Sequence, residues 1–365
     1  MQVRERFLKV MNYEKVDKVP NFDFGYWPET IKRWHKEGLP TNIDDQIKCE
    51  LYFGLEGVEQ IVSVPISVSL YPHFEEKVIE DKGEHVIIQD KEGVLFEKSK
   101  TSASIPKYLK FPIETKEDWE RFKKERLDPD SPGRVPEEEL KELKECWRNR
   151  GYITKIYCGS LYGCLRNWMG LENISIKIIE DPVWIEEMME HLTNLSLKVL
   201  ERTFEVLGDV KIDCSWWWED MCFNKGPLIS PKLFEKLMVP RYKRIVSFLE
   251  EKGIKIHIVD CDGKIDELVP LWLEAGINCM FPIEVACNDP IELRKKYGKR
   301  CLMIGGVDKR ALIKGKKAID EELNRLKDLV KDGGFIPCVD HKVPPDVSLE
   351  NYLYYLRRKE EILLI

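Results

Sequence analysis

A regular alternation of short apolar runs and longer amphipathic runs in the second half of the chain constrains its fold more than any other feature. The apolar runs are rich in Ile and Val and lack a polar face, which is typical of strands that are buried on both sides. Five of them lie at 210–217, 253–260, 277–284, 301–308 and 334–340. Strands that alternate with helices indicate a parallel sheet joined by right-handed crossovers.

Capping residues mark the helices between these runs. A polar residue followed by proline, which is a common start of a helix, stands at 181–182, 230–231 and 289–290. Glycine is a common residue after the end of a helix. We therefore expect helices that run from these three positions to near the glycines at 208, 253 and 298.

The first half of the chain is less regular, but three further strands fit it, at 19–26, 57–64 and 152–159. Eight strand–helix units in 365 residues predict a single α/β domain over 1–365, folded as a (β/α)8 TIM barrel. Between the second and third strands, residues 76–99 alternate apolar and polar side chains around the turns DKG and DKEG. We therefore expect a β-hairpin insertion over about 74–113. A doubly wound open sheet is the alternative fold, because the pattern alone does not show that the barrel closes.

The net charge and the cysteines limit the cellular compartments and the classes of partner that we expect for the protein. With 58 Lys and Arg against 65 Asp and Glu, the net charge is −7, so we expect no nucleic-acid partner, because phosphates attract basic surfaces. No run reaches the ~18 apolar residues of a membrane span, and the charged first segment is unlike a signal peptide. The 11 cysteines are scattered without a CxxC pair, which favours free thiols in the cytoplasm. The oligomeric state is not fixed by the sequence, and a homodimer is one of the states that it allows.

Polar residues, most of them acidic, stand at the ends of several predicted strands. The catalytic groups of a barrel lie at the carboxyl ends of its strands. The candidates for catalysis in this chain are Glu219, Asp220, Asp262, Glu284 and His341. An acid at a strand end also serves as a helix cap or a turn residue, and that alternative stays open for each one taken alone.

The segment 257–263, His-Ile-Val-Asp-Cys-Asp-Gly, contains the densest set of metal-capable side chains. Side chains alternate faces along a strand at about 3.3 Å per residue. Asp260 and Asp262 therefore share a face, roughly 7 Å apart, and can converge on one ion or substrate. His257 and Cys261 would lie about 13 Å apart, and we expect His257 to pack toward the helices. Cys261 stays ambiguous, because the glycine that follows lets the loop turn sharply.

His341 ends the last predicted strand, and neutral imidazole suits both metal binding and acid–base chemistry. We expect it to act as a metal ligand or a general acid–base group; a loop histidine is the alternative. Three tryptophans at 216–218 cannot all face one core, so we expect at least one, assigned to Trp218, to line a pocket for a flat or apolar ligand; packing of all three against neighbouring helices is the alternative. Asp23, Tyr26 and Trp27 enter a segment that we interpret as a substrate-binding loop, with a surface helix as the alternative.

Several segments, in order, carry a family resemblance: GPLISP (226–231) after WWWED, VDCDG (259–263), AGINCMFPIE (275–284), DPIELRKKYG (289–298), IGGVD (304–308) and the ending at 333–352. Through them the chain resembles the uroporphyrinogen decarboxylase superfamily, and within it the branch related to corrinoid-dependent (methylcobalamin) methyltransferases. The resemblance covers most of residues 150–360 and implies a (β/α)8 barrel.

Departures from the patterns of the two subfamilies bear on the activity. Uroporphyrinogen decarboxylases carry an Arg-rich N-terminal segment for the carboxylates of a tetrapyrrole, and the corresponding stretch at 26–40 lacks that pattern. The related methyltransferases hold zinc with a His-x-Cys-Gly motif and a late Cys. Alignment on the glycine and proline that follow these motifs puts Asp260, Asp262 and His341 at the ligand positions. The resemblance thus implies a harder site for zinc or another divalent ion, or a site that has lost its metal.

The leading expectation is a methyltransferase that moves a methyl group between a small molecule and a corrinoid. An ion at the three ligand positions would act as a Lewis acid, Glu219, Asp220 and Glu284 would position or protonate the substrate, and Trp218 would form a pocket wall. The chain has no D-x-H-x-x-G type of corrinoid-binding segment, so the corrinoid would arrive on a partner protein over the barrel mouth. The alternatives are a decarboxylase that needs no cofactor and a non-catalytic binding protein on the same barrel.

Overall fold

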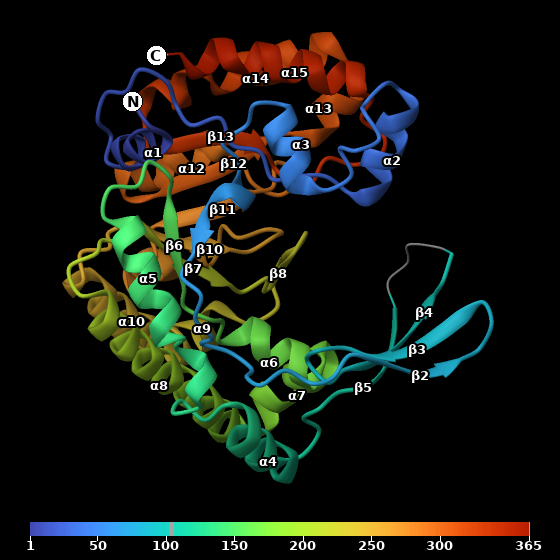
Figure 1. Cartoon of the computed structure of the whole chain (residues 1–365), viewed down its shortest axis with the longest axis vertical. Helices are drawn as coiled ribbons and strands as arrows, with labels where there is room; N and C mark the ends of the chain where they lie inside the picture. Colours follow the sequence, from blue (N-terminus) through green and yellow to red (C-terminus); the bar gives the residue numbers. More distant parts are fainter. Residues whose placement is uncertain (102–105, 365) are drawn as a thin grey trace.

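The computed structural model of the protein describes residues 1–101 and 106–364. Within them, seven strands form one parallel sheet in the order β1-β6-β7-β10-β11-β12-β13. They are β1 (Val62–Ser63), β6 (Thr154–Tyr157), β7 (Cys214–Trp218), β10 (His257–Asp260), β11 (Cys279–Ile283), β12 (Leu302–Val307) and β13 (Phe335–Val339), and each overlaps a predicted strand. The sheet curls as in a TIM barrel, and helices cover its outer side (Figure 1). The predicted α/β class and the barrel-like parallel sheet are therefore confirmed.

The predicted strand at 19–26 is wrong, because this segment is extended but pairs only through an isolated bridge at Tyr26. Pro20 has no N–H to donate to a ladder. The side chain of Asp23 replaces part of the pairing by accepting a hydrogen bond from the backbone N–H of Val339 at 2.9 Å. The segment thus contacts β13 without joining the sheet, and the parallel sheet of the described residues has seven strands instead of eight.

The residues predicted to cap helices do so. The side chains of Asp181, Ser230 and Asp289 accept backbone N–H groups at the starts of α8 (Pro182–Leu207), α9 (Pro231–Leu237) and α12 (Pro290–Tyr297). The helix predicted to continue to about 252 is interrupted at Met238, after which α10 (Val239–Glu251) begins. Pro240, in the first turn of α10, cannot donate the backbone hydrogen bond that a continuous helix needs, so the break falls here.

The other helices complete the layer around the sheet. They are α1 (Val3–Met11), α2 (Pro28–Lys36), α3 (Gln46–Tyr52), α4 (Lys116–Arg126), α5 (Glu137–Trp147), α6 (Tyr162–Met169), α7 (Leu171–Glu180), α11 (Val269–Ala275), α13 (Lys309–Lys314), α14 (Lys316–Asp332) and α15 (Leu349–Leu363), with 3-10 turns η1 (Val58–Gln60), η2 (Pro132–Arg134) and η3 (Gly298–Arg300). Because α6 follows the carboxyl end of β6 directly, its N-terminus lies near the barrel mouth. In the described ranges, no helix is both long and apolar enough to cross a membrane.

A second, antiparallel sheet extends from the body of the protein (Figure 1). It contains β2 (Lys77–Asp81), β3 (His85–Gln89), β4 (Leu95–Ser99) and β5 (Lys107–Lys110), in that order. Its first two turns use the DKG and DKEG sequences, in which the side chains of Asp81 and Asp90 each accept a backbone N–H at 2.9 Å. That this sheet is an insertion into a barrel stays a prediction. A short ladder of β8 (Cys222–Phe223) and β9 (Gly226–Pro227) follows β7.

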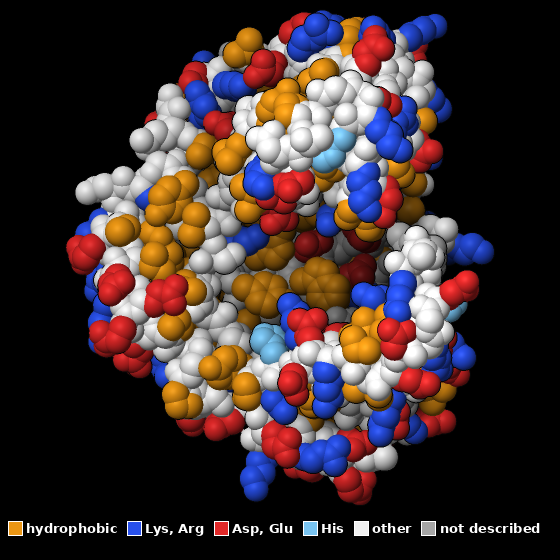
Figure 2. Space-filling model, turned by 45° about the vertical axis from the view of Figure 1, so that its right-hand side comes forward, with side chains coloured by type: hydrophobic (Ala, Val, Ile, Leu, Met, Phe, Trp, Pro, Cys, Tyr) orange, Lys and Arg blue, Asp and Glu red, His pale blue; other side chains and the backbone are white. Residues whose placement is uncertain are grey.

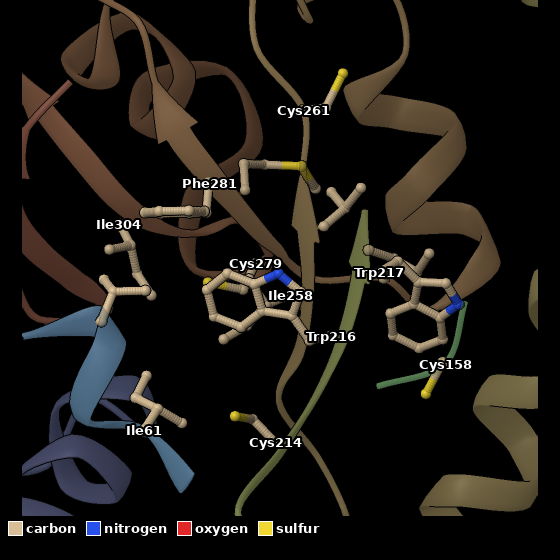
Figure 3. Close-up of a cluster of buried hydrophobic side chains, with 14 of the residues drawn as sticks. Ile61, Cys158, Cys214, Trp216, Trp217, Ile258, Cys261, Cys279, Phe281 and Ile304 are labelled. Atoms are coloured by element: carbon tan, nitrogen blue, oxygen red, sulfur yellow. The ribbon is translucent and has the colours of Figure 1, made fainter. Parts of the chain in front are cut away.

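The consecutive tryptophans show how the strands separate the barrel interior from the helix layer. Trp216 points toward Cys279 and Phe281 of β11, and Trp217 points the opposite way (Figure 3). Trp217 packs against Tyr242 of α10, with ring centroids 6.4 Å apart. Because alternate residues of a strand share a face, Trp218 lies on the same side as Trp216, nearer the mouth.

A buried ion pair fixes the amino ends of two strands. The guanidinium of Arg150, just before β6, lies 2.8 Å from the carboxylate of Asp213, just before β7, and both side chains are buried. Asp213 also accepts hydrogen bonds from the backbone N–H of Thr154 and from Arg4 of α1, each at 2.8 Å. This carboxylate therefore ties the first helix to β6 and β7 at the end of the sheet opposite the mouth.

Candidate active site

Figure 2 shows a deep hollow with hydrophobic side chains on its floor and acidic and basic side chains around its edge. The carboxyl ends of the parallel strands point toward this side of the molecule (Figure 1). Side chains on the interior face of the strands, near their carboxyl ends, therefore form the floor of the barrel mouth.

Three polar side chains share that interior face with two aromatic rings. Tyr157 of β6 is in register with Trp216 of β7, and Lys155 lies two residues earlier on the same face. The ammonium of Lys155 is 4.4 Å from the centroid of the Trp216 ring. Asp260 of β10 is in register with Phe281 of β11, whose ring lies 5.1 Å from that of Trp216. An amine, a phenol and a carboxyl group thus border one aromatic floor.

Asp260 is a half-buried carboxyl group with other acids nearby. Burial, together with the negative charges of Asp262 and Asp220, raises its pKa to about 8. The side chain of Trp216 is hydrogen-bonded to it. At neutral pH the group is therefore largely protonated and is able to give a proton to a ligand in the hollow.

Lys155 and Tyr157 are absent from the residues predicted for the site. Burial lowers the pKa of the Lys155 ammonium and raises the pKa of the Tyr157 phenol. Across residues 1–101 and 106–364, neither the ammonium nor the phenol hydroxyl has a hydrogen-bond or ion-pair partner. The signal that could have found them lies in the predicted strand at 152–159, because a lysine in a strand buried on both faces must point to a partner or to a cavity.

His341 and Asp262 meet at the rim of the mouth. The imidazole Nε2 of His341 lies 3.4 Å from Oδ2 of Asp262. The imidazole packs against Phe24 and Trp27, with ring centroids 5.3 Å and 5.9 Å away. Trp27 is 43% exposed, so its ring is available to a ligand. The second carboxylate oxygen of Asp262, Oδ1, is buried without a hydrogen-bond partner among the residues described.

The three predicted metal ligands do not converge, although Asp262 and His341 are in contact. The strand β10 ends at Asp260, whose carboxyl group faces the interior beside Trp216. Asp262 instead belongs to a loop that turns at Gly263, with φ +81°, so the alternation expected of one continuous strand does not extend to it. In the part of the chain that the structure describes, no group of three His, Cys, Asp or Glu side chains could hold a metal ion. The residues present therefore do not fit the predicted site for zinc or another divalent ion.

Glu219 is buried and acts as a structural acceptor. Its carboxylate accepts hydrogen bonds from the hydroxyl groups of Ser160 at 2.9 Å and Tyr242 at 2.5 Å. It also accepts three backbone N–H groups of residues 161–163, at 2.8–3.2 Å, beside the N-terminus of α6. Burial raises the pKa of Glu219, while these donors act in the opposite direction. Because the donors occupy both oxygens, the predicted catalytic role of Glu219 is not supported, and the residue holds the loop between β6 and α6.

Asp220 and Glu284 are each tied to a cation. The guanidinium of Arg166 binds the Asp220 carboxylate at 2.8 Å and lies 5.3 Å from the centroid of the Trp218 ring. Asp220 and Arg166 also line a cavity of about 710 Å³ together with residues of the antiparallel sheet. Glu284 accepts a hydrogen bond from the ammonium of Lys309 at 3.2 Å. Asp220 and Glu284 therefore each have a basic partner in the wall of the mouth.

Asp23 and Tyr26 are buried and hydrogen-bonded within the protein. Asp23 accepts a hydrogen bond from the hydroxyl of Tyr352 at 2.6 Å, and the hydroxyls of Tyr26 and Tyr352 are 2.7 Å apart. The predicted substrate contacts of Asp23 and Tyr26 are therefore not supported, since both side chains anchor the N-terminal segment to α15. His257 is buried on the helix side of β10, as expected. Its Nδ1 lies 2.7 Å from the hydroxyl of Ser215, and burial lowers its pKa to about 3.

The curled parallel sheet, with polar groups at the carboxyl ends of its strands, has the architecture of a TIM-barrel-like α/β fold. The chain belongs to the uroporphyrinogen decarboxylase (URO-D) family, whose model matches residues 166–360, more than half of the chain. The strand that carries Lys155 and Tyr157 lies just before the matched part.

Similar proteins agree with this family and fold. A uroporphyrinogen decarboxylase from Campylobacter concisus (strain 13826) is 24% identical over 184 residues, 49% of this chain and 49% of that protein. Another from Campylobacter lari (strain RM2100) is 21% identical over 190 residues, 50% of this chain and 51% of that protein. The chain thus spans about half the length of the curated relatives that it matches. A solved methyltransferase from Methanosarcina mazei has a similar fold, with a TM-score of 0.60 and 14% identity over 99% of both chains.

Proposed function

We propose that this protein is a methyltransferase that moves a methyl group from a small molecule to a corrinoid carried by a partner protein. The observation that supports this best is Asp260, a half-buried carboxyl group in register with Phe281 on the aromatic floor, whose pKa is raised to about 8. Removal of a methyl group from oxygen or nitrogen leaves a heteroatom that needs a proton, and a positioned acid supplies it. The solved protein of similar fold from Methanosarcina mazei is itself a methyltransferase, which agrees with this class of reaction.

In this reaction, the bond between the methyl carbon and the heteroatom breaks, and its electron pair stays on the heteroatom. Asp260 gives its proton to that heteroatom and becomes a carboxylate. The reduced corrinoid, as the second substrate, provides the electron pair for the new bond to the methyl carbon. Lys155, on the same interior face, stabilises the new carboxylate until the solvent returns a proton.

The edge of the hollow suits a partner that brings a large group. Trp27 at the rim is 43% exposed, and Phe223, which lines the neighbouring cavity, is 55% exposed. Exposed aromatic side chains are enriched in protein interfaces. We therefore expect the corrinoid protein to bind over the hollow, with these two rings in the contact.

A direct test uses free, chemically reduced cobalamin as the corrinoid substrate. Purified protein is mixed with it and with methoxyarenes, methylamines or methyl thioethers, and methylcobalamin formation is followed by visible absorbance. We expect one of these classes to react, and Asp260→Asn to reduce its rate by about 10²–10⁴-fold. The rate should be constant below pH 8 and fall above it, because the acid with a pKa of about 8 must be protonated.

The matched control is Glu235→Gln, which removes an exposed acid from α9 and should leave the rate unchanged. Two outcomes would contradict the proposal. One is that no donor class yields methylcobalamin while the protein is folded. The other is that Asp260→Asn retains the wild-type rate.

A cofactor-free decarboxylase is the second candidate, and the similarity to uroporphyrinogen decarboxylases favours it. In that reaction the carbon–carboxyl bond breaks, CO2 leaves, and Asp260 protonates the carbanion. The missing Arg-rich pattern at 26–40 counts against a tetrapyrrole substrate. Release of CO2 from an aromatic or pyrrole carboxylate without any corrinoid would favour this candidate over methyl transfer.

A further inference from the structure

Lys155 is a cation inside the barrel that the structure leaves without a partner. Its ammonium lies over the Trp216 ring at 4.4 Å, and among the described residues it makes no hydrogen bond and no ion pair. Glu59 and Asp260 are close enough to act on it electrostatically, but neither is in contact with it. Lys155 is half-buried, and an ammonium carries three hydrogen-bond donors, which are costly to leave unused where little water reaches them. A side chain retained at that cost is expected to meet a ligand.

The neighbouring groups indicate the charge of that ligand. The hydroxyl of Tyr157, two residues along β6, is also free of a partner in the described structure and is able to donate a hydrogen bond. One cation and one hydroxyl donor on the same face of β6, beside the aromatic floor, form a set of donors that suits an anion.

The walls indicate the shape and the class of the anion. The rings of Trp216 and Phe281 are inclined by 64° with centroids 5.1 Å apart, and that of Phe24 lies 4.8 Å from Phe281. Aromatic walls of this kind favour a flat ligand over a bulky, fully hydrated one. A phosphate dianion would need more positive charge than one ammonium, and the nearby Arg166 is already bound to Asp220 at 2.8 Å. A carboxylate, with one charge and two acceptor oxygens, matches the set.

We propose that Lys155 and Tyr157 bind the carboxylate of a planar, ring-containing small molecule whose ring lies against Trp216 and Phe281. This names the substrate class of the methyl transfer proposed above and rests on it for the reaction. The binding itself needs neither a corrinoid nor a methyl group. The ion pair with the substrate would satisfy Lys155 and leave the Asp260 proton free for the heteroatom.

The test is calorimetric titration of the full chain with benzoate and with benzamide, its uncharged analogue of the same shape, at neutral pH. We expect benzoate to bind at least tenfold more tightly than benzamide. Lys155→Met should remove this preference without weakening benzamide binding, and Lys155→Arg should keep part of it. The matched control is Lys255→Met, which removes an exposed lysine at the amino end of β10 and should leave both affinities unchanged.

Several results would overturn the proposal: equal binding of benzoate and benzamide, no binding of benzoate, or full binding of benzoate to a folded Lys155→Met variant. Circular dichroism and urea unfolding establish that the variant is folded, and Lys155→Arg provides the second variant. Inorganic phosphate that displaces benzoate at equal concentration would show that the carboxylate class is wrong. Because the titration contains no corrinoid, it can succeed where the methyl-transfer assay fails, and then the reaction alone is refuted.

Discussion

The protonated state of Asp260 predicts a pH dependence of stability that can be measured without knowing the substrate. Burial and two neighbouring carboxylates raise the pKa of this carboxyl group from 3.8 to about 8. Between these values the folded protein holds a proton that the unfolded chain has already released. The free energy of unfolding therefore falls as the pH rises from about 4 to 8, and the stabilisation is complete only below the lower value.

The magnitude follows from linkage. One bound proton changes the free energy of unfolding by about 1.4 kcal/mol per pH unit, so the loss between pH 5 and pH 7 is about 2.7 kcal/mol. Asp260→Asn keeps the shape of the side chain but cannot ionise, so this loss disappears in the variant. The difference between the two proteins, variant minus wild type, should therefore rise by about 2.7 kcal/mol over that pH interval.

Urea unfolding of both proteins at closely spaced pH values measures this difference directly. Other titrating groups are common to both chains and cancel. Glu235→Gln is the control, because it makes the same kind of substitution at an exposed acid on α9. A flat difference for Asp260→Asn would show that Asp260 is ionised in the folded protein, and it would remove the acid from the proposed reaction.

Three further predictions follow from the same contacts. Asp262→Asn removes a negative charge that raises the pKa of Asp260. In this background, the difference in the free energy of unfolding between proteins with Asn and with Asp at position 260 should therefore change over a lower pH range; an unchanged pH range would contradict this. Lys155→Met removes a half-buried ammonium that makes no hydrogen bond or ion pair among the described residues, and it should raise the free energy of unfolding by about 1 kcal/mol in urea titrations at neutral pH; a loss of stability would show that the contact with the Trp216 ring outweighs the cost of the unused donors. Asp213→Ala leaves Arg150 buried without its partner at 2.8 Å and should cost about 3–5 kcal/mol by the same method; a cost below about 1 kcal/mol would rule out the ion pair as the link between β6 and β7.

Most of the fold could be predicted because its signals are local. Each of the seven strands lies within or overlaps an apolar run, and the caps at Asp181, Ser230 and Asp289 act on backbone groups two or three residues away. The strand predicted at 19–26 is wrong for the opposite reason. It has the composition of a strand, but the group that takes the place of its ladder is the side chain of Asp23, whose partner Val339 is 316 residues away.

The candidate site was predictable in position but not in role. Glu219 and Asp260 both stand at the carboxyl end of a strand, and the sequence treats them alike. Glu219 is surrounded by the start of α6 and the hydroxyl of Tyr242, which saturate its oxygens. Asp260 has other acids around it and keeps its proton instead. Which of two similar acids is free depends on partners that come from other elements, so no local pattern distinguishes them.

The two rim acids, Asp262 and Asp220, thus have a role different from the metal binding and catalysis expected from their positions at the strand ends. Asp262 and Asp220 form no metal-binding group with Asp260 among the described residues, but their negative charges help to keep Asp260 neutral. An ionised Asp260 would attract the ammonium of Lys155, and the two groups would satisfy each other on the floor of the hollow. A neutral Asp260 leaves the ammonium without a counter-charge from the protein. The negative charges of the rim therefore keep the proton on Asp260 that the proposed reaction needs. They also keep Asp260 from pairing with Lys155, whose ammonium would bind an anionic substrate.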